Sequence, residues 1–239
     1  MKVSVIMTAW NTARWIDAAL ASVTLSSHTD LDIVVVDDGS KDATADICAH
    51  WAGQDERIRF VLLDRHVGRN AALKEAHDLA VGDVLCWVDS DDLVHHDGIS
   101  RAVAALDADH QLAATRRNLI DVNGRDLGID RRFNSGDPLM LAHAFFHLRV
   151  FTAEVFAQSG GVGDKAAAID LDMNLRMAEH TAFRRVNESL YWYRQRPGRM
   201  SDGQLQGINA REAMIEALER RGIDGGIVWS NGRWRVQVR

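Results

Sequence analysis

Residues 31–40 read LDIVVVDDGS, an almost wholly apolar run that ends at two aspartates, a glycine and a serine. Most of the run is β-branched, and a strand that is apolar on both faces is typical of a parallel sheet covered by helices. Residues 84–92, VLCWVDSDD, show the same arrangement of an apolar run followed by acidic residues. The two segments therefore predict buried parallel strands whose carboxyl ends carry carboxylates.

Segments whose apolar residues recur at helical spacing alternate along the chain with these and other short apolar runs. Strands are expected at residues 3–7, 31–36, 58–63 and 84–88, and helices at 12–26, after an N-cap at Ser40, at 69–80 and around 99–106. Strands and helices that alternate at this spacing form right-handed crossovers. The expected fold class is therefore α/β, with a mostly parallel central sheet between helix layers. Ligands of such sheets lie at the carboxyl ends of the strands.

The second half of the chain follows a less regular pattern. The expected elements are strands at 113–122, 148–151 and 191–194, a short apolar helix or loop at 139–146, helices at 166–180 and 204–221, and a hairpin at 228–236. Tight turns are expected at the Asn-Gly pairs 123–124 and 231–232.

Charge and composition exclude several classes of protein. The 28 Lys and Arg residues against 34 Asp and Glu residues give a formal net charge of −6, so no nucleic-acid partner is expected. Cys48 and Cys86 are too few for a disulfide scaffold. No signal peptide and no run of about 18 apolar residues is found, so no transmembrane segment is predicted. We expect a soluble, cytoplasmic protein, with peripheral attachment at the inner face of a membrane left open.

Five carboxylates are expected to converge at one edge of the sheet. Asp37 and Asp38 follow the second strand, and Asp89, Asp91 and Asp92 follow the fourth. Because like charges repel, a bound divalent cation would offset the cost of this arrangement, and oxygen ligands suit Mg²⁺ or Mn²⁺. The alternative is that each cluster only forms a turn or caps a helix. The presence of both clusters in this alternation favours the cation.

Four motifs occur in order along the chain: VIMTAWN at 5–11, VDDGS at 36–40, GRNAAL at 68–73 and VDSDD at 88–92. The ordered set resembles the family 2 glycosyltransferases over roughly residues 1–200. The resemblance implies an inverting enzyme of the GT-A fold that uses a nucleotide-diphosphate sugar. We expect one domain over 1–202, with a nucleotide-binding half (1–110) and an acceptor-side half (111–202), and a C-terminal extension over 203–239.

The resemblance also implies roles for residues of the nucleotide-binding half. Thr8, Ala9 and Trp10 fall where the family holds the nucleoside, with the aromatic ring over the base. Asp38 falls where a carboxylate accepts the imide N–H of uracil, and Arg69 falls where a basic side chain contacts the base.

Residues 89–92 occupy the DxD region of the family. The resemblance makes Asp92 the direct metal ligand, and it makes Ser90 and Asp91 contacts of the ribose or the sugar. Asp89 is expected near the same site, without an assigned contact. The implied cofactor is Mn²⁺ or Mg²⁺.

The catalytic base is expected in residues 170–176, DLDMNLR. They resemble the family's acidic motif, in which an acidic residue lies six positions before an Arg, and Asp170 takes that place. The usual Glu before it is Ile169 here, which departs from the family. Residues two apart do not share a helical face, so one carboxylate is expected to act, with Asp172 as the alternative. A helix-start carboxylate stabilised by the helix dipole is the non-catalytic interpretation.

A second departure lies in residues 193–201. Many relatives carry a His after the Tyr-Arg pair, whereas Gln195 and Arg196 stand here. One interpretation is that Arg196 or Arg199 binds the diphosphate. The alternative is that both are ordinary surface arginines of a loop. His143 and His147 are four apart in an apolar segment without an apparent third ligand, and neither is expected to bind a metal.

The expected reaction is transfer of a single sugar from a UDP-sugar to an acceptor hydroxyl by metal-assisted direct displacement. A polymerising synthase is disfavoured by the short chain and the lack of membrane helices. One alternative is a sugar-phosphate nucleotidyltransferase, but residues 8–11 are not the Gly-rich phosphate loop that it would need. The other is an inactive nucleotide- or carbohydrate-binding module. The acceptor stays open between a glycan, a lipid-linked, a protein and a small-molecule acceptor, and a homo-oligomer is also left open.

Overall fold

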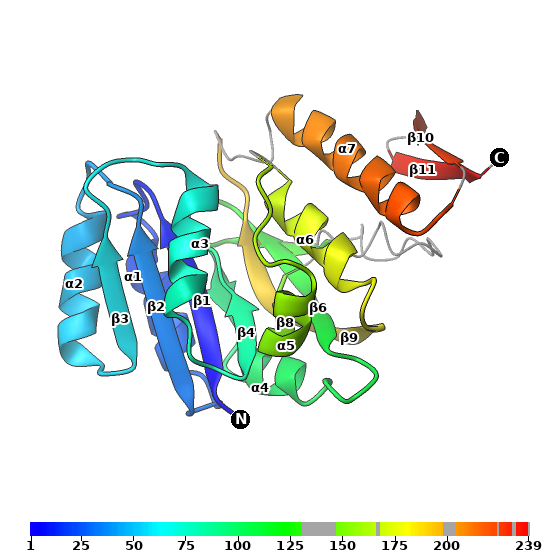
Figure 1. The fold of residues 1–239 in the computed structure, drawn as a ribbon. Helices are drawn as coiled ribbons and strands as arrows, with labels where there is room; N and C mark the ends of the chain where they lie inside the picture. The colour runs from blue at the N-terminus through cyan, green and yellow to red at the C-terminus, as the bar shows by residue number, and fades with distance from the viewer. Residues whose placement is uncertain (131–146, 166–167, 198–203, 224, 231–232, 239) are drawn as a thin grey trace.

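Nine strands of the described residues form one sheet in the order β3-β2-β1-β4-β8-β6-β9-β5, with β7 paired to β6 (Figure 1). The structure is a computed structural model that describes residues 1–130, 147–165, 168–197, 204–223, 225–230 and 233–238. The strands are β1 (Val3–Ala9), β2 (Leu31–Asp37), β3 (Ile58–Leu62), β4 (Val84–Trp87), β5 (Leu93–Val94), β6 (Leu112–Ile120), β7 (Asp126–Ile129), β8 (Arg149–Thr152) and β9 (Phe183–Arg194). The helices are α1 (Ile16–Thr24), α2 (Thr44–Gln54), α3 (Arg69–Leu79), α4 (Gly98–Val103), α5 (Ala153–Gln158), α6 (Ile169–Met177) and α7 (Gln204–Arg220).

The first half of the chain forms the parallel part of the sheet. Strand β1 pairs in parallel with both β2 and β4, and β2 pairs in parallel with β3. The second half adds β8, which is antiparallel to both β4 and β6, while β6 and β9 are parallel to each other. Because β8 is reversed, its first residues lie at the edge where β4 ends.

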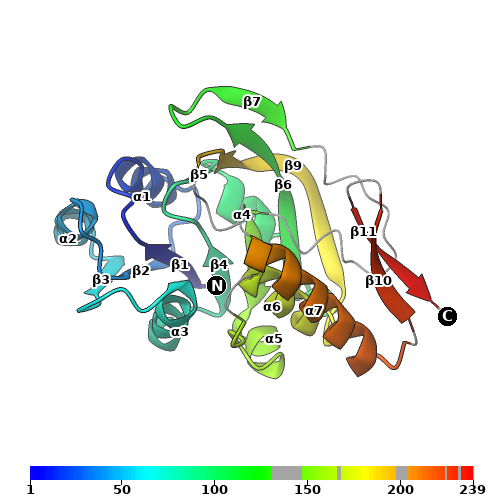
Figure 2. The same cartoon turned by 90° about the horizontal axis from the view of Figure 1, so that it is seen from above.

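Alternation along the buried strands distributes side chains to two helix layers. Ile33 and Val35 of β2 belong to the core that contains α1, α2 and α4. Val34 and Val36 belong to the core that contains α3, α5 and α6. Figure 2 shows α1 and α3 on opposite sides of the sheet. The predicted α/β class with a central sheet between helix layers is therefore confirmed.

Ser40 does not cap the second helix, so that prediction is wrong. Helix α2 begins at Thr44, with Ala43 before it, and the backbone N–H of Thr44 donates to Asp42 Oδ1. The Ser40 hydroxyl instead accepts a 2.8 Å hydrogen bond from the backbone N–H of Asn11. Ser40 thus ties the end of β1 to the turn after β2, where the cavity described below opens.

The C-terminal helix packs on α6. Leu171 and Leu175 of α6 share a core with apolar residues of α7, among them Ala213, Met214 and Ala217. The predicted hairpin is present as β10 (Gly225–Ser230) antiparallel to β11 (Arg233–Val238). The turn of this hairpin lies outside the described residues, and so does the segment 139–146. The expected boundary at 202–203 lies outside them as well, so the division into a domain and an extension stays a prediction.

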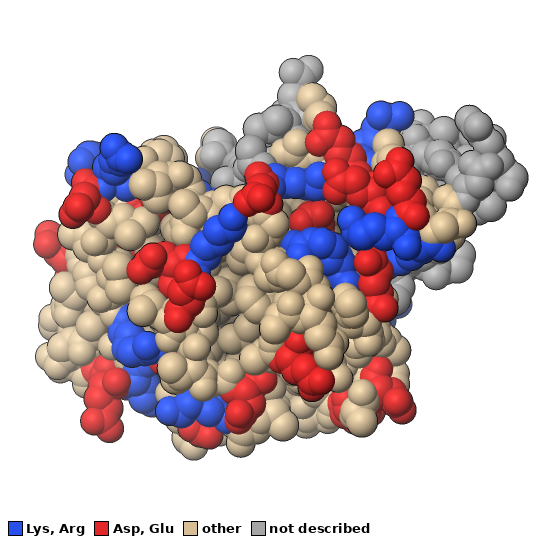
Figure 3. Space-filling view, viewed as in Figure 1, with Lys and Arg blue, Asp and Glu red and all other residues tan. Residues whose placement is uncertain are grey.

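The described surface is mixed in charge. On the face shown in Figure 3, Lys and Arg side chains are interspersed with Asp and Glu side chains. Among the described helices, none has an apolar stretch long enough to cross a bilayer.

Candidate active site

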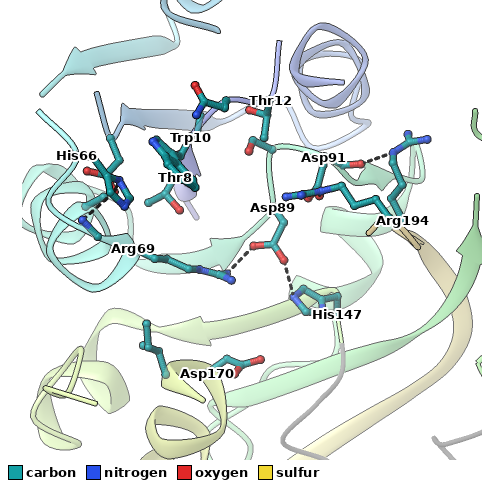
Figure 4. A pocket seen from close by; sticks show the side chains of 18 of the residues that line it. Thr8, Trp10, Thr12, His66, Arg69, Asp89, Asp91, His147, Asp170 and Arg194 are labelled. Carbon is teal, nitrogen blue, oxygen red and sulfur yellow. Dashed lines mark hydrogen bonds and ion pairs between the residues drawn. The ribbon is translucent and has the colours of Figure 1, made fainter. Parts of the chain in front are cut away.

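A cavity of about 560 Å³ opens at the carboxyl ends of β1, β2 and β4 (Figure 4). Both halves of the chain contribute to its wall. Its lining residues are Thr8, Ala9, Trp10, Asn11, Thr12, Asp38, His66, Gly68, Arg69, Ala72, Asp89, Ser90, Asp91, His147, Ala168, Ile169, Asp170, Tyr193, Arg194 and Arg196. The structure thus brings together Thr8, Ala9, Trp10, Asp38, Arg69, Ser90, Asp91, Asp170 and Arg196 among the residues singled out in the sequence.

The turn after β2 holds the segment that follows β3. Gly39 has φ 65°, and a Cβ at this position would lie 2.6 Å from the backbone nitrogen of His66. A glycine therefore lets the two segments pass closely. Asp38 Oδ1 accepts the backbone N–H of Val67 at 2.6 Å, and Oδ2 accepts that of Gly68 at 2.9 Å. His66 Nδ1 lies 2.8 Å from the same Oδ2.

Trp10 forms an aromatic wall just beyond the end of β1. Its side chain is 49 % exposed and stacks on His66, with ring centroids 4.2 Å apart and an interplanar angle of 18°. Asn11 follows with φ 52°, and its Oδ1 accepts the backbone N–H of Lys41. These bonds join the chain after β1 to the turn after β2 and fix the backbone from which Trp10 projects.

A chain of charged and polar side chains runs along the cavity, and Figure 4 shows its part from Arg69 through Asp89 to His147. Arg69 Nη2 lies 2.6 Å from Asp89 Oδ1, and Asp89 Oδ2 lies 3.3 Å from His147 Nε2. Arg149 Nη2 lies 3.3 Å from the same imidazole nitrogen, and Arg149 Nη1 lies 3.1 Å from Asp170 Oδ2. The acidic cluster after β4 is therefore connected to the first turn of α6.

Burial and neighbouring charges set the protonation of this chain. Burial alone would raise the pKa of Asp89, but Arg69 and His147 outweigh it and hold that pKa well below its usual range. Burial and the charge of Arg149 lower the pKa of His147 to about 4. At pH 7 the carboxylate is therefore ionised and the imidazole neutral. Arg117 Nη1 lies 3.2 Å from His147 Nδ1.

Asp170 faces the cavity and Asp172 does not. The Asp170 side chain is 23 % exposed. Burial opposes its ionisation, yet Arg149, His147 and Arg69 lower the pKa of Asp170. Asp172 is 4 % exposed, and its Oδ2 pairs with Arg176 Nη2 at 3.0 Å. Of these two described aspartates, Asp170 is therefore the one with access to a ligand.

Asp92, which the resemblance makes the metal ligand, is not among the residues that line the cavity. Asp92 is 1 % exposed and lies behind the cavity wall, where its Oδ1 accepts the backbone N–H of Arg194 at 2.7 Å. Burial and the nearby Asp91 and Asp89 raise the pKa of Asp92 well above its usual range. Asp91 lines the cavity instead, and its carboxylate pairs with Arg196 Nε. The chain turns after β4, so that consecutive aspartates face different surroundings.

The carboxylates in the cavity fit part of a metal shell. Asp89 and Asp91 offer the oxygen donors that Mg²⁺ and Mn²⁺ prefer. No group of three or more His, Cys, Asp or Glu that could hold an ion occurs among the described residues. A Mg²⁺ ion is commonly bound by one or two carboxylates together with water and substrate phosphates, and the site fits that mode.

Other lining residues were not singled out in the sequence. His66 follows the third strand, so the rule that ligands lie at the carboxyl ends of strands could have identified it. The sequence gives His147 no role, because no third metal ligand is apparent beside His143 and His147. His147 reaches the cavity because β8 runs antiparallel to β4, a pairing that sequence spacing does not reveal. Tyr193 and Arg194 come from the end of β9. Arg199 lies outside the described residues.

The sequence of the chain is similar to those of known glycosyltransferases. The family model described as Glycosyl transferase family 2 matches residues 4–162. Chondroitin synthase from Escherichia coli is 29 % identical over 235 residues, a match that covers 92 % of this chain and 33 % of that protein. The chain spans between 20 % and 52 % of the length of four curated relatives that it matches.

Solved structures resemble the fold. Residues 1–349 of S. aureus TarS, in complex with UDP-GlcNAc, align with a TM-score of 0.76 at 20 % identity, covering 92 % of this chain and 66 % of that one. The mannosyltransferase PcManGT from Pyrobaculum calidifontis, in complex with GDP-Man and Mn²⁺, aligns with a TM-score of 0.71 at 19 % identity. That alignment covers 92 % of this chain and 64 % of the other.

Proposed function

Because the chain belongs to glycosyl transferase family 2, we propose that it moves one sugar from a UDP-sugar to an acceptor hydroxyl, with inversion at the anomeric carbon. The observation that carries this proposal is the composition of the cavity. An aromatic ring and a carboxylate at one end suit a nucleobase, and cations and carboxylates in the middle suit a diphosphate. An ionised aspartate at the far side suits a proton acceptor.

The nucleoside is proposed to bind at Thr8, Ala9, Trp10 and Asp38. The exposed ring of Trp10 offers a stacking surface, and Asp38 Oδ2 is an acceptor for a ring N–H. TarS was solved with UDP-GlcNAc and PcManGT with GDP-Man. Uracil and guanine both carry a ring N–H beside a carbonyl, which an aspartate recognises, whereas adenine and cytosine do not. We favour uridine because the resemblance places Asp38 where a carboxylate accepts the imide N–H of uracil, and TarS was solved with UDP-GlcNAc.

The diphosphate is proposed to lie between Arg196 and the acidic residues after β4, and Arg69 is proposed to contact the base, as the resemblance implies. Guanidinium groups bind phosphate through paired hydrogen bonds, and Arg196 can exchange its contact with Asp91 for one with phosphate. A Mg²⁺ or Mn²⁺ ion held by Asp91 and the diphosphate would stabilise negative charge on the departing phosphate. We assign this role to Asp91 in preference to Asp92, whose carboxylate is buried behind the wall. Ser90 is proposed to contact the ribose or sugar.

Asp170 is proposed to be the general base. Its low pKa keeps it ionised at pH 7, so it can accept the proton of the acceptor hydroxyl. The hydroxyl oxygen then forms a bond to the anomeric carbon as the bond from that carbon to the diphosphate oxygen breaks. The sugar ring is oxocarbenium-like at that point. Attack on the face opposite the leaving group gives inversion without a covalent intermediate.

Donor turnover tests the proposal. The chain is incubated with a panel of nucleotide sugars and Mn²⁺, and nucleotide release is followed with and without candidate acceptors. We expect slow UDP release from one UDP-sugar without acceptor, faster release with a sugar acceptor, and neither in the Asp170→Asn variant. Binding without UDP release would indicate a module without turnover. Formation of UTP from a UDP-sugar and pyrophosphate would indicate nucleotidyl transfer.

Binding can be screened before any acceptor is known. A ligand at 100 times its dissociation constant adds about 2.7 kcal/mol to the free energy of unfolding, which is visible as a higher melting temperature. We expect this stabilisation for UDP-sugars and a larger effect when Mn²⁺ is present.

A further inference from the structure

His66, a half-exposed residue after β3, makes two contacts at the cavity. Its ring lies flat on Trp10, at 4.2 Å between centroids and 18° between planes. Its Nδ1 lies 2.8 Å from Asp38 Oδ2. The side chain is 48 % exposed, so burial does not hold it there, and these two contacts account for its position.

The same two contacts are those proposed for the base of the donor. A uracil ring stacked on Trp10 with its imide N–H directed at Asp38 would take the surface and the acceptor that His66 now uses. Both rings are planar, and both present a ring N–H at the edge. If the base stacks on the face of Trp10 that His66 covers, His66 and the base compete for that face and for one carboxylate oxygen.

The carboxylate itself is held independently of His66. The backbone N–H groups of Val67 and Gly68 donate to its two oxygens at 2.6 and 2.9 Å. When the imidazole leaves, Asp38 keeps these bonds and its orientation. The base then replaces a single hydrogen bond and a single stacking contact, so the exchange leaves no buried group without a partner.

We propose that His66 occupies the nucleobase subsite and is displaced when the donor binds. The inference rests on the proposed function, since it takes the donor to be a nucleotide whose base carries a ring N–H. In this arrangement His66 lowers the apparent affinity for the nucleotide, because only the fraction of molecules with His66 displaced is competent to bind.

Calorimetric titration of the full chain with UDP in the presence of Mn²⁺ tests the competition. We expect His66→Ala to bind UDP about threefold to tenfold more tightly than the unaltered chain, the range that one aromatic pair supplies. His50→Ala is the matched control, because His50 is an exposed histidine on α2 that does not line the cavity. Its affinity should equal that of the unaltered chain.

A second measurement uses the unaltered chain and does not depend on the folding of a variant. The ring current of Trp10 should shift the Hε1 resonance of His66 upfield in the free chain. Saturation with UDP should move that resonance to the position of an exposed histidine.

Each other outcome overturns the inference. Equal or weaker UDP binding by folded His66→Ala would mean that His66 is neutral or holds the base directly. A His66 resonance that stays upfield at UDP saturation would mean that the ring is not displaced. If neither the unaltered chain nor His66→Ala binds UDP, the proposed donor is wrong and the inference falls with it. If UDP still binds and either of the first two results is found, the inference is wrong while the proposed donor stands.

Discussion

Arg149 Nη1 lies 3.1 Å from Oδ2 of Asp170, and this ion pair joins the first residue of β8 to the first turn of α6. The Arg149 side chain is 1 % exposed, and its guanidinium carbon lies 5.3 Å from the centre of the Trp87 ring. A cation held this firmly fixes both the direction and the charge state of the carboxylate beside it. The proposed base is therefore positioned by an element that lies distant in the sequence.

Arg149→Met is expected to lower transfer by about tenfold to a hundredfold, because a small displacement of a reacting group has an effect of that size. The acid limb of the rate profile should also move to higher pH. Arg149 is the largest influence that lowers the pKa of Asp170 against burial, so its loss raises that pKa. More of the base is then protonated at a given acidic pH. The measurement is kcat as a function of pH.

Arg149→Lys is the control for this experiment, since it retains a positive charge near Asp170. The acid limb of the kcat profile of Arg149→Lys should lie closer to that of the unaltered chain than the limb of Arg149→Met does. This should hold even when the kcat of Arg149→Lys is low. A lower kcat with an unmoved pH profile in Arg149→Met would show that Arg149 positions Asp170 without controlling its pKa.

Asp170→Asn is expected to reduce transfer by about 10²–10⁴-fold, the usual contribution of a general base, with UDP affinity unchanged. Asn keeps the size of the side chain but cannot accept the proton. Asp172→Asn should retain most transfer activity and instead lower the free energy of unfolding by about 1–3 kcal/mol, because it weakens a buried bond to Arg176. Single-turnover rates and melting curves of the two variants decide the assignment. An inactive Asp172→Asn beside an active Asp170→Asn would move the base to Asp172.

Trp10→Ala is expected to weaken UDP binding by about 1–3 kcal/mol, the range measured for base stacking on aromatic side chains. The melting temperature should change little, because Trp10 is 49 % exposed. Calorimetry and thermal melting are measured on the same preparations. A large fall in melting temperature with unchanged UDP affinity would instead assign Trp10 to packing.

Asp91→Asn is expected to abolish the increase in donor affinity that Mn²⁺ produces, because it removes a charged oxygen from the cavity. Asp92→Asn should keep that increase, because its side chain lies behind the wall and Asn still accepts the bond from the Arg194 backbone. UDP titrations with and without Mn²⁺ compare the two variants. Loss of the metal effect in Asp92→Asn alone would restore the role that the sequence assigned to Asp92.

The parallel half of the fold could be predicted from the sequence because its signals are local. A run such as 31–36 is apolar on both faces, which requires a helix layer on each side. The acidic residues that follow must then lie at the carboxyl edge of the sheet. The positions of Trp10, Asp38 and Asp91 in one cavity follow from this reasoning.

Sequence spacing also separated Asp170 from Asp172, because helical geometry places residues two apart on different faces. It did not show which of Asp91 and Asp92 lines the cavity. These two residues lie in an irregular turn, where the direction of each side chain depends on contacts with β9 that are distant in sequence.

The tertiary structure alone decided the other half of the site. His147 and Arg149 reach the cavity because β8 pairs antiparallel with β4, and no local pattern specifies the direction of that pairing. The stacking of His66 on Trp10 joins the ends of two strands across the turn that Gly39 permits. Local residue patterns determine which elements form and at which edge their polar residues lie. Long-range packing determines which of those side chains face the same space, since that depends on contacts between segments far apart along the chain.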